Sequence, residues 1–280
     1  MAAERPRWVQ ADATAPLSPG PLIRIAHGGL QVDIAPQAGG RIASIVRHGV
    51  EQLVGYGEPH TAMIDWGCYP MLPWAGRIRG GRFKFDGRDF QLPMNLGAHA
   101  IHGTGLAMSW QVQSRDARSL ELSLALPQDA RWPFGGTACQ RMELSDDQLE
   151  LHLSLEAGTL AMPAVVGWHP WFRKPERLRF SPDAMYPRDE AGIATLPVVP
   201  PAPGPWDDCF INTQRISLDY EGFQLHLSSD CRHWVVYDQA DGAACVEPQS
   251  GPPDAFNIEP CVLAPGDVLH RWFRMEWKDG

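Results

Sequence analysis

The sequence has no long hydrophobic run, and none of its apolar stretches approaches the length of about 18 residues that indicates a membrane-spanning helix. Its first residues, Met-Ala-Ala-Glu-Arg-Pro-Arg, contain no apolar segment of the kind found in signal peptides. The six cysteines show neither CxxC spacing nor a paired pattern, which indicates reduced thiols rather than a disulfide framework. We therefore expect a cytoplasmic protein with no membrane partner.

Positively charged residues are fewer than negatively charged ones. Twenty-four Lys and Arg residues face 33 Asp and Glu residues, which gives a formal net charge of −9. Nucleic acids and anionic membrane surfaces both require a cationic face, so the balance disfavours them as partners and suits a neutral small molecule. No sequence feature favours one oligomeric state over another.

Several catalytic motifs are missing as well. The chain has no Gly-rich phosphate loop, no HExxH and no Gly-x-Ser-x-Gly elbow. His99 and His102 stand three residues apart without a nearby cysteine or acidic ligand, which is a weak metal pattern. We expect neither a metal ion nor an organic cofactor.

Short runs of alternating apolar and polar residues dominate what remains. A period of two is typical of half-buried strands, and it recurs in residues 30–34, 120–126, 149–155 and 223–227. Asp86-Gly87 between two such runs predicts a hairpin over 82–92, and a second hairpin is expected to turn at 145–147. With 26 prolines, 27 glycines and no convincing helical period, the predicted class is all-β, a large antiparallel β-sandwich.

The domain organisation is expected to be simple. Residues 1–20 are rich in Ala, Pro and polar side chains and predict a flexible N-terminal arm. Residues 21–280 are expected to form one domain. The Pro-rich segment 197–205 is interpreted as a rigid surface loop within it, because strand patterning resumes on both sides.

Four segments that we interpret as loops contain residues that a fold alone does not require. Glu247 stands in a Pro- and Gly-rich stretch, and a carboxylate there is a candidate base, although a surface glutamate in a turn would look similar. His169 and Trp171 lie in Gly-Trp-His-Pro-Trp-Phe, where flat rings could stack on a sugar and a partly dry imidazole could serve as an acid, or all could be an aromatic core cluster. Arg77 could hold sugar hydroxyls or a carboxylate through its planar fork, with a surface ion pair as the plainer alternative. His102 is a candidate catalytic residue, although a lone histidine is more often structural.

The order of these segments resembles one known family, the aldose 1-epimerases or galactose mutarotases. Each motif is weak alone, but together they extend in order from about residue 20 to the C-terminus. They are Pro73-Trp-Ala-Gly-Arg77-Ile, His102-Gly103, His169-Pro-Trp-Phe172, Asp207-Asp-Cys-Phe210, Val246-Glu247 through Pro253-Asp254-Ala, and Leu263-Ala-Pro-Gly-Asp267.

The resemblance implies a β-supersandwich of the galactose mutarotase type whose wide sheet holds one sugar. It implies that Glu247 is the base, that His169 is the acid, and that Arg77, His102 and Asp207 hold the substrate. The chain departs from the family pattern in having Gly76 where Asn is usual, Trp171 where Tyr is frequent, and Val235 where a glutamine is common.

We therefore expect an isomerase that interconverts the α and β anomers of a free aldose. Glu247 would take the C1 hydroxyl proton and His169, which its reference pKa of about 6.5 makes easy to protonate, would give one to the ring oxygen. One alternative is a hexose-6-phosphate mutarotase with a cationic pocket built from Arg77, Arg79 and Arg82. Another is a non-catalytic carbohydrate-binding or sensing domain on the same fold, and a third is an enzyme for a modified or acidic sugar.

Overall fold

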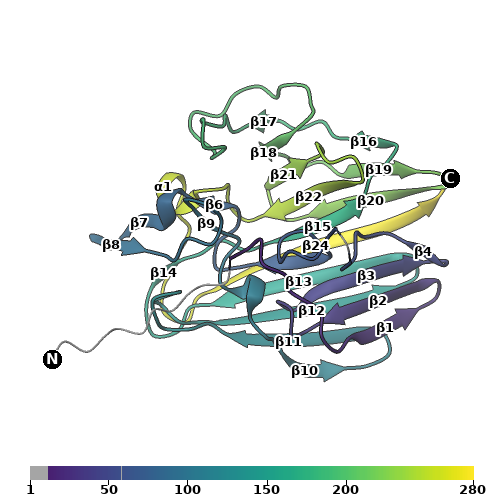
Figure 1. Ribbon diagram of the computed structural model, residues 1–280, viewed down its shortest axis with the longest axis horizontal. Coiled ribbons are helices and arrows are strands. Elements are labelled where there is room, and N and C mark those ends of the chain that lie inside the picture. The colour runs from purple at the N-terminus through teal and green to yellow at the C-terminus, as the bar shows by residue number, and fades with distance from the viewer. Residues whose placement is uncertain (1–11, 58) are drawn as a thin grey trace.

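Two large antiparallel sheets pack face to face in the computed structural model, which describes residues 12–57 and 59–280 (Figure 1). The first sheet has ten strands in the order β1-β2-β3-β5-β15-β22-β21-β18-β17, and β4 also pairs with β3. These strands span Ile23–His27 (β1), Leu30–Ala35 (β2), Arg41–Arg47 (β3), Val50–Glu51 (β4), Cys68–Met71 (β5), Gly167–Arg173 (β15), Ala243–Gln249 (β22), His233–Tyr237 (β21), Asp207–Ile211 (β18) and Ala184–Met185 (β17).

The second sheet has eight strands in the order β10-β11-β12-β13-β24-β20-β19-β16. They span Gln111–Arg115 (β10), Ser119–Ala125 (β11), Thr137–Ser145 (β12), Gln148–Glu156 (β13), Val268–Asp279 (β24), Phe223–Ser229 (β20), Ile216–Tyr220 (β19) and Arg177–Arg179 (β16). The predicted all-β sandwich is thereby confirmed.

Three two-stranded ribbons and very short helices complete the described part of the chain. The ribbons pair Arg77–Ile78 (β6) with Ala100–Ile101 (β9), Arg82–Phe85 (β7) with Arg88–Gln91 (β8), and Met162–Pro163 (β14) with Val262–Leu263 (β23). The helices are Ala255–Ile258 (α1) and two 3₁₀ turns, Arg79–Gly81 (η1) and Gly105–Ala107 (η2). Among the described helices, none has the length and apolar character needed to cross a membrane.

Both predicted hairpins are confirmed. β7 and β8 pair around Asp86-Gly87, and both turn residues have positive φ, as such a two-residue turn requires. β12 and β13 pair from Thr137↔Glu156 to Ser145↔Gln148, and the hairpin turns between Ser145 and Gln148. The Pro-rich segment 197–205 lies in the long connection between β17 and β18.

The space between the sheets is filled by every second residue of the strands. In β13 the leucines 149, 151, 153 and 155 are completely buried, and each contributes about 1.5–3 kcal/mol of transfer free energy. From the first sheet, Trp168 and Trp234 meet Phe273 of β24, with ring centroids 5.9 and 6.1 Å apart. Because successive side chains of a strand point to opposite faces, the residues next to these tryptophans in the chain point out of the sandwich.

Part of the expected N-terminal arm is attached to the body. Residues 1–11 lie outside the described residues. In the rest, the N–H of Ala13 donates to the carbonyl of Asn95 at 2.8 Å, and the N–H of Leu17 donates to that of Thr61 at 3.0 Å. Ala13 is completely buried.

The loop after β9 packs tightly against the loop after β5. Gly105 donates to the carbonyl of Leu72 at 3.1 Å, and His102 donates to that of Gly76 at the same distance. Gly103 has φ +77, and a Cβ there would lie only 1.8 Å from the Leu72 carbonyl oxygen. Position 103 therefore requires glycine both for its backbone conformation and for the close approach of the two loops.

Substituting this glycine should lower the stability of the protein by more than the strain of a positive φ alone. We predict that Gly103→Ala lowers the free energy of unfolding by more than about 2 kcal/mol, since strain and a backbone collision add. Gly87→Ala is the matched control, because Gly87 has φ +70 but open space around its Cα, and it should cost only about 1 kcal/mol. Urea unfolding of both variants checks this, and equal losses would contradict the proposed collision.

Candidate active site

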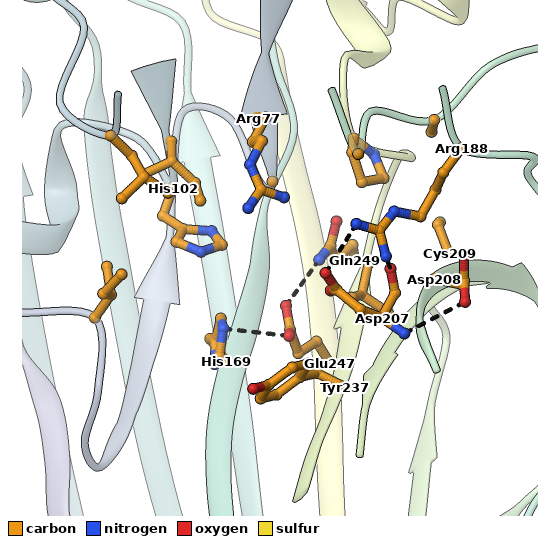
Figure 2. A pocket seen from close by; sticks show the side chains of 18 of the residues that line it. Arg77, His102, His169, Arg188, Asp207, Asp208, Cys209, Tyr237, Glu247 and Gln249 are labelled. Atoms are coloured by element: carbon orange, nitrogen blue, oxygen red, sulfur yellow. Dashed lines mark hydrogen bonds and ion pairs between the residues drawn. The ribbon is translucent and has the colours of Figure 1, made fainter. Parts of the chain in front are cut away.

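A pocket of about 290 Å³ lies on the outward face of the ten-stranded sheet, under the β6–β9 ribbon and the connection that follows β17 (Figure 2). The structure brings all six predicted site residues to this one cavity. They are Arg77, His102, His169, Trp171, Asp207 and Glu247.

The expectation that Arg77, His169, Trp171 and Glu247 sit on loops is wrong, and for His102 it is confirmed. His169 and Trp171 are on β15, Glu247 is on β22, Asp207 is on β18 and Arg77 begins β6. Only His102 lies outside a strand, immediately after β9. The prolines beside His169 and Glu247 suggested loops because proline is rare in central strands.

Strand register places the candidate base opposite the candidate acid. Gly167 pairs with Gln249 and Trp171 with Cys245, so His169 lies across from Glu247 between these two pairs. His169 Nε2 and Glu247 Oε1 are 3.2 Å apart. That separation allows one proton to be shared between them.

Glu247 is almost completely buried, with 2% of its surface exposed. Burial raises the pKa of its carboxyl group well above the ordinary value, and the nearby Asp207 raises it further. The Gln249 amide and the Arg77 guanidinium act in the opposite direction. Loss of hydration is the larger effect, so Glu247 holds its proton more tightly than a surface glutamate does.

His169 is also buried, between two aromatic rings. It stacks on Tyr69 at 4.7 Å and on Trp171 at 5.6 Å. Burial lowers its pKa to about 3, with a smaller contribution from the positive charge of Arg41. Burial therefore opposes the easy protonation that the sequence led us to expect for this imidazole, because the charged form has lost its water.

The two shifts together describe a pair that holds one proton. A carboxyl group with a raised pKa beside an imidazole with a lowered pKa keeps that proton over a wide pH range, on the carboxyl side in the free protein. Moving it across the 3.2 Å contact converts the pair into a carboxylate and an imidazolium. The arrangement can therefore offer a base and an acid to a bound molecule at the same time.

Arg77 and His102 face this pair across the pocket (Figure 2). The Arg77 guanidinium has no ion pair or side-chain hydrogen bond with any described residue, so the surface ion pair considered from the sequence is not formed. His102 packs edge-on against His169, with ring centroids 5.0 Å apart. Burial, His169 and Arg77 hold the pKa of His102 well below its usual range, which leaves it neutral.

Sequence reasoning missed five further polar residues that line the pocket, namely Asp65, Arg188, Asp208, Tyr237 and Gln249. Arg188 holds Asp207 through a 3.0 Å ion pair and a hydrogen bond to its carbonyl oxygen. Gln249 stands two residues after Glu247, so placing Glu247 on a strand would have revealed it on the same face. Arg188 lies in an irregular connection and gave no such signal.

The three departures from the family pattern all border the pocket: Gly76, Trp171 and Val235. Gly76 has φ +63, and a Cβ there would lie 2.8 Å from Pro253. A side chain at position 76 would therefore collide with the loop that contains Pro253. Val235 lies directly across the strand from Glu247. It gives the candidate base an apolar neighbour on the strand away from His169.

One group of potential metal ligands occurs among the described residues, and it overlaps the pair. Ligand atoms of His169, Cys245 and Glu247 all lie within 4.8 Å of one another. Burial raises the pKa of the Cys245 thiol far above its ordinary value, so a metal ion would have to displace a tightly held proton. The expectation that the chemistry needs no metal stays a prediction.

Comparison with known proteins places this architecture in a defined class. The fold is that of the galactose mutarotase-like proteins: a structure of such a protein from Clostridium acetobutylicum superposes with a TM-score of 0.83 at 18% identity, covering 92% of this chain and 95% of the other. The structure of a galactose 1-epimerase from Lactobacillus acidophilus NCFM gives 0.77 at 18% identity, with 92% and 95% covered. At such identities the likeness shows the fold alone.

The sequence comparison goes further. The sequence model that defines the aldose 1-epimerase family matches residues 21–276, and the chain belongs to that family. A relative from Escherichia coli K12, the uncharacterised protein YphB, is 31% identical over 90% of this chain and 98% of its own length. A second protein of that organism, the uncharacterised YihR, is 26% identical over 91% and 92%.

The state of His169 can be observed directly. We predict that NMR of labelled histidine shows its imidazole still neutral at pH 5, with protonation near pH 3. Because burial is the first cause of the lowered pKa, the same should hold in Glu247→Gln. A titration near pH 6.5 in either folded protein would contradict the desolvation argument.

Proposed function

We propose that the protein is an aldose 1-epimerase that interconverts the α and β anomers of a free aldose by general acid–base catalysis. The observation that carries the proposal is the buried Glu247–His169 contact of 3.2 Å at the base of a pocket large enough for one sugar ring. Membership of the aldose 1-epimerase family supports the same conclusion.

Because the pair holds one proton, Glu247 can accept a proton while His169 donates one. In its carboxylate–imidazolium form, Glu247 takes the proton of the C1 hydroxyl while His169 gives its proton to the ring oxygen, and the C1–ring oxygen bond breaks to leave an aldehyde. The pair then holds its single proton on Glu247. Rotation about the C1–C2 bond followed by the reverse transfers closes the ring with the other configuration.

The remaining pocket residues bind and orient the sugar in this proposal. The unpaired Arg77 guanidinium and the neutral His102 donate to hydroxyl groups. Asp207, held by Arg188, accepts from others, and Trp171 offers an apolar ring face. The Trp171 indole itself is fixed by donation to the Ile64 carbonyl at 2.6 Å.

The charges of the pocket favour a neutral sugar over a phosphorylated one. Two arginines and four carboxyl side chains line it: Arg77 and Arg188, with Asp65, Asp207, Asp208 and Glu247. Arg79 and Arg82, which a phosphate site would recruit, line a neighbouring cavity instead. Arg79 is paired with Asp189 at 2.6 Å, and Arg82 donates to Gln91.

A silent binding domain is also less well supported. Binding a neutral sugar requires hydrogen bonds and an aromatic face, and it gains nothing from a carboxyl group and an imidazole that are both taken out of water. Taking the two groups out of water costs free energy, and such a cost is typical of sites that transfer protons rather than of sites that only bind.

Removing the base should stop the reaction without unfolding the protein. Glu247→Gln keeps the shape of the side chain and should slow anomer exchange by at least about 10²-fold. Exchange is followed by NMR or polarimetry over a panel of free aldoses and hexose 6-phosphates, with the uncatalysed rate subtracted. Near wild-type activity in the folded variant would exclude Glu247 as the base.

The same panel separates the alternatives. A clear preference for 6-phosphates, lost in an Arg77→Ala variant, would favour the phosphorylated substrate. Sugar binding with no acceleration on any member of the panel would favour the binding domain. Arg82→Gln serves as the control, because that side chain lies outside the pocket and should leave exchange unchanged.

The pH profile tests the shared proton. A second proton joins the pair only near the His169 pKa of about 3, so activity should not decline as the pH falls from 7 to 5. On the alkaline side the raised pKa of Glu247 sets the limit, and activity should fall when the pair loses its only proton. Loss of activity through pH 6.5, as from a free imidazolium acid, would contradict the shared-proton mechanism.

A further inference from the structure

Gln249 is the residue that holds the second carboxyl oxygen of Glu247, the one that does not contact His169. It stands on β22 two residues after Glu247 and is completely buried. Its Nε2 donates to Glu247 Oε2 at 3.1 Å, while Oε1 of the same carboxyl group faces His169 (Figure 2). The two carboxyl oxygens therefore have different partners.

The orientation of the Gln249 amide follows from this contact. Rotating the amide by half a turn would set two oxygen acceptors 3.1 Å apart, because the proton of the pair lies between Glu247 Oε1 and His169 and leaves Oε2 as an acceptor. With Nε2 committed to Glu247, Oε1 of Gln249 has no hydrogen-bond partner among the described residues, although it is buried. The side chain lines the pocket, so this acceptor is available to a bound molecule.

The neighbouring strand leaves room for this arrangement. Gly167 of β15 pairs with Gln249, and a Cβ at that glycine would lie 3.1 Å from Gln249 Cγ and 2.6 Å from the Pro248 carbonyl oxygen. A larger residue at 167 would displace the glutamine side chain or the strand. The close approach fixes where the amide can lie.

We propose that Gln249 is a positioning and binding residue of the site: its N–H holds Oε2 of Glu247 so that Oε1 alone exchanges the proton with His169 and the sugar, and its amide oxygen accepts a hydroxyl group of the bound aldose. The proposal rests on the proposed function, and it assigns to one side chain both the selection of the reactive carboxyl oxygen and a contact with the substrate.

Two consequences follow from the two ends of the amide. A hydrogen bond to a carboxylate favours its ionised form, so Gln249 opposes the increase in the pKa of Glu247 that burial causes. Removing the N–H should therefore move the alkaline limit of activity upward. A buried acceptor without a donor costs free energy, so a sugar hydroxyl that satisfies it gains affinity.

The test is Gln249→Met, which keeps the length of the side chain and removes both polar atoms. We expect the alkaline limb of the pH profile to move up by about one pH unit. KM should rise by about three- to tenfold, the equivalent of one neutral hydrogen bond. In parallel, isotope-edited infrared titration should show the carboxyl group of Glu247 ionising at higher pH in the variant.

Gln52→Met is the matched control. Gln52 is another buried glutamine whose amide is fully used, since it accepts from the Trp277 indole at 3.0 Å and donates to the Val50 carbonyl at 2.9 Å. It does not line the pocket. The substitution should lower stability and leave the pH profile, KM and the Glu247 titration unchanged.

The infrared titration needs no turnover, so it separates failure of this proposal from failure of the proposed function. An unchanged Glu247 titration in folded Gln249→Met would overturn the positioning role, whatever the activity. An unchanged KM would overturn the contact with the sugar. If no aldose is turned over but the titration shifts, the positioning of the carboxyl group stands and the epimerase assignment fails.

Discussion

Antiparallel register across five neighbouring strands is the constraint on which the pocket depends. From β5 to β18 it aligns one row of outward side chains: Tyr69, His169, Glu247, Val235 and Cys209. Strands about 4.8 Å apart bring the candidate acid and the candidate base within reach of one another without any loop having to close. A shift of one residue in a single strand would turn its member of the row into the sandwich core and a core residue into the pocket. Because the inner faces carry residues such as Trp168 and Trp234, the hydrophobic core enforces the register that the site needs.

The ladder between β15 and β22 is interrupted where His169 meets Glu247. Pairing occurs at Gly167↔Gln249 and resumes at Trp171↔Cys245, and the interval contains Pro170 and Pro248, which have no N–H to donate. Buried Arg41 supports the neighbouring rings: it donates to four carbonyl oxygens and lies 4.9 Å from the centre of the Tyr69 ring. Its pKa falls to about 10 through burial, so it remains charged near neutrality and disfavours a second positive charge on His169.

The sequence predicted the parts of the fold that depend on local patterns. Alternation over 149–155 became β13, and Asp86-Gly87 became a hairpin turn, because both signals act within a few residues. The same reasoning placed Glu247 and His169 on loops, because prolines stand beside them and their strands, buried on both faces, show no apolar–polar alternation. The family resemblance supplied their proximity, which no local pattern contains. Arg188 and the lowered pKa of His169 could not be found in this way, because the first belongs to an irregular connection and the second is a property of the closed pocket.

In the proposed mechanism, the burial of the pair also accounts for the acceleration of a weakly demanding reaction. In water, a carboxylate and an imidazolium are each stabilised by hydration, and little is gained by moving a proton between them and a sugar. In the pocket both ionic forms have lost that hydration, so the neutral pair with its proton on Glu247 is favoured. A sugar that brings a C1 hydroxyl to Glu247 and a ring oxygen to His169 replaces this direct contact with one through its own atoms. Opening the ring then returns the pair to the form with both partners neutral, which is the form that the dry pocket stabilises.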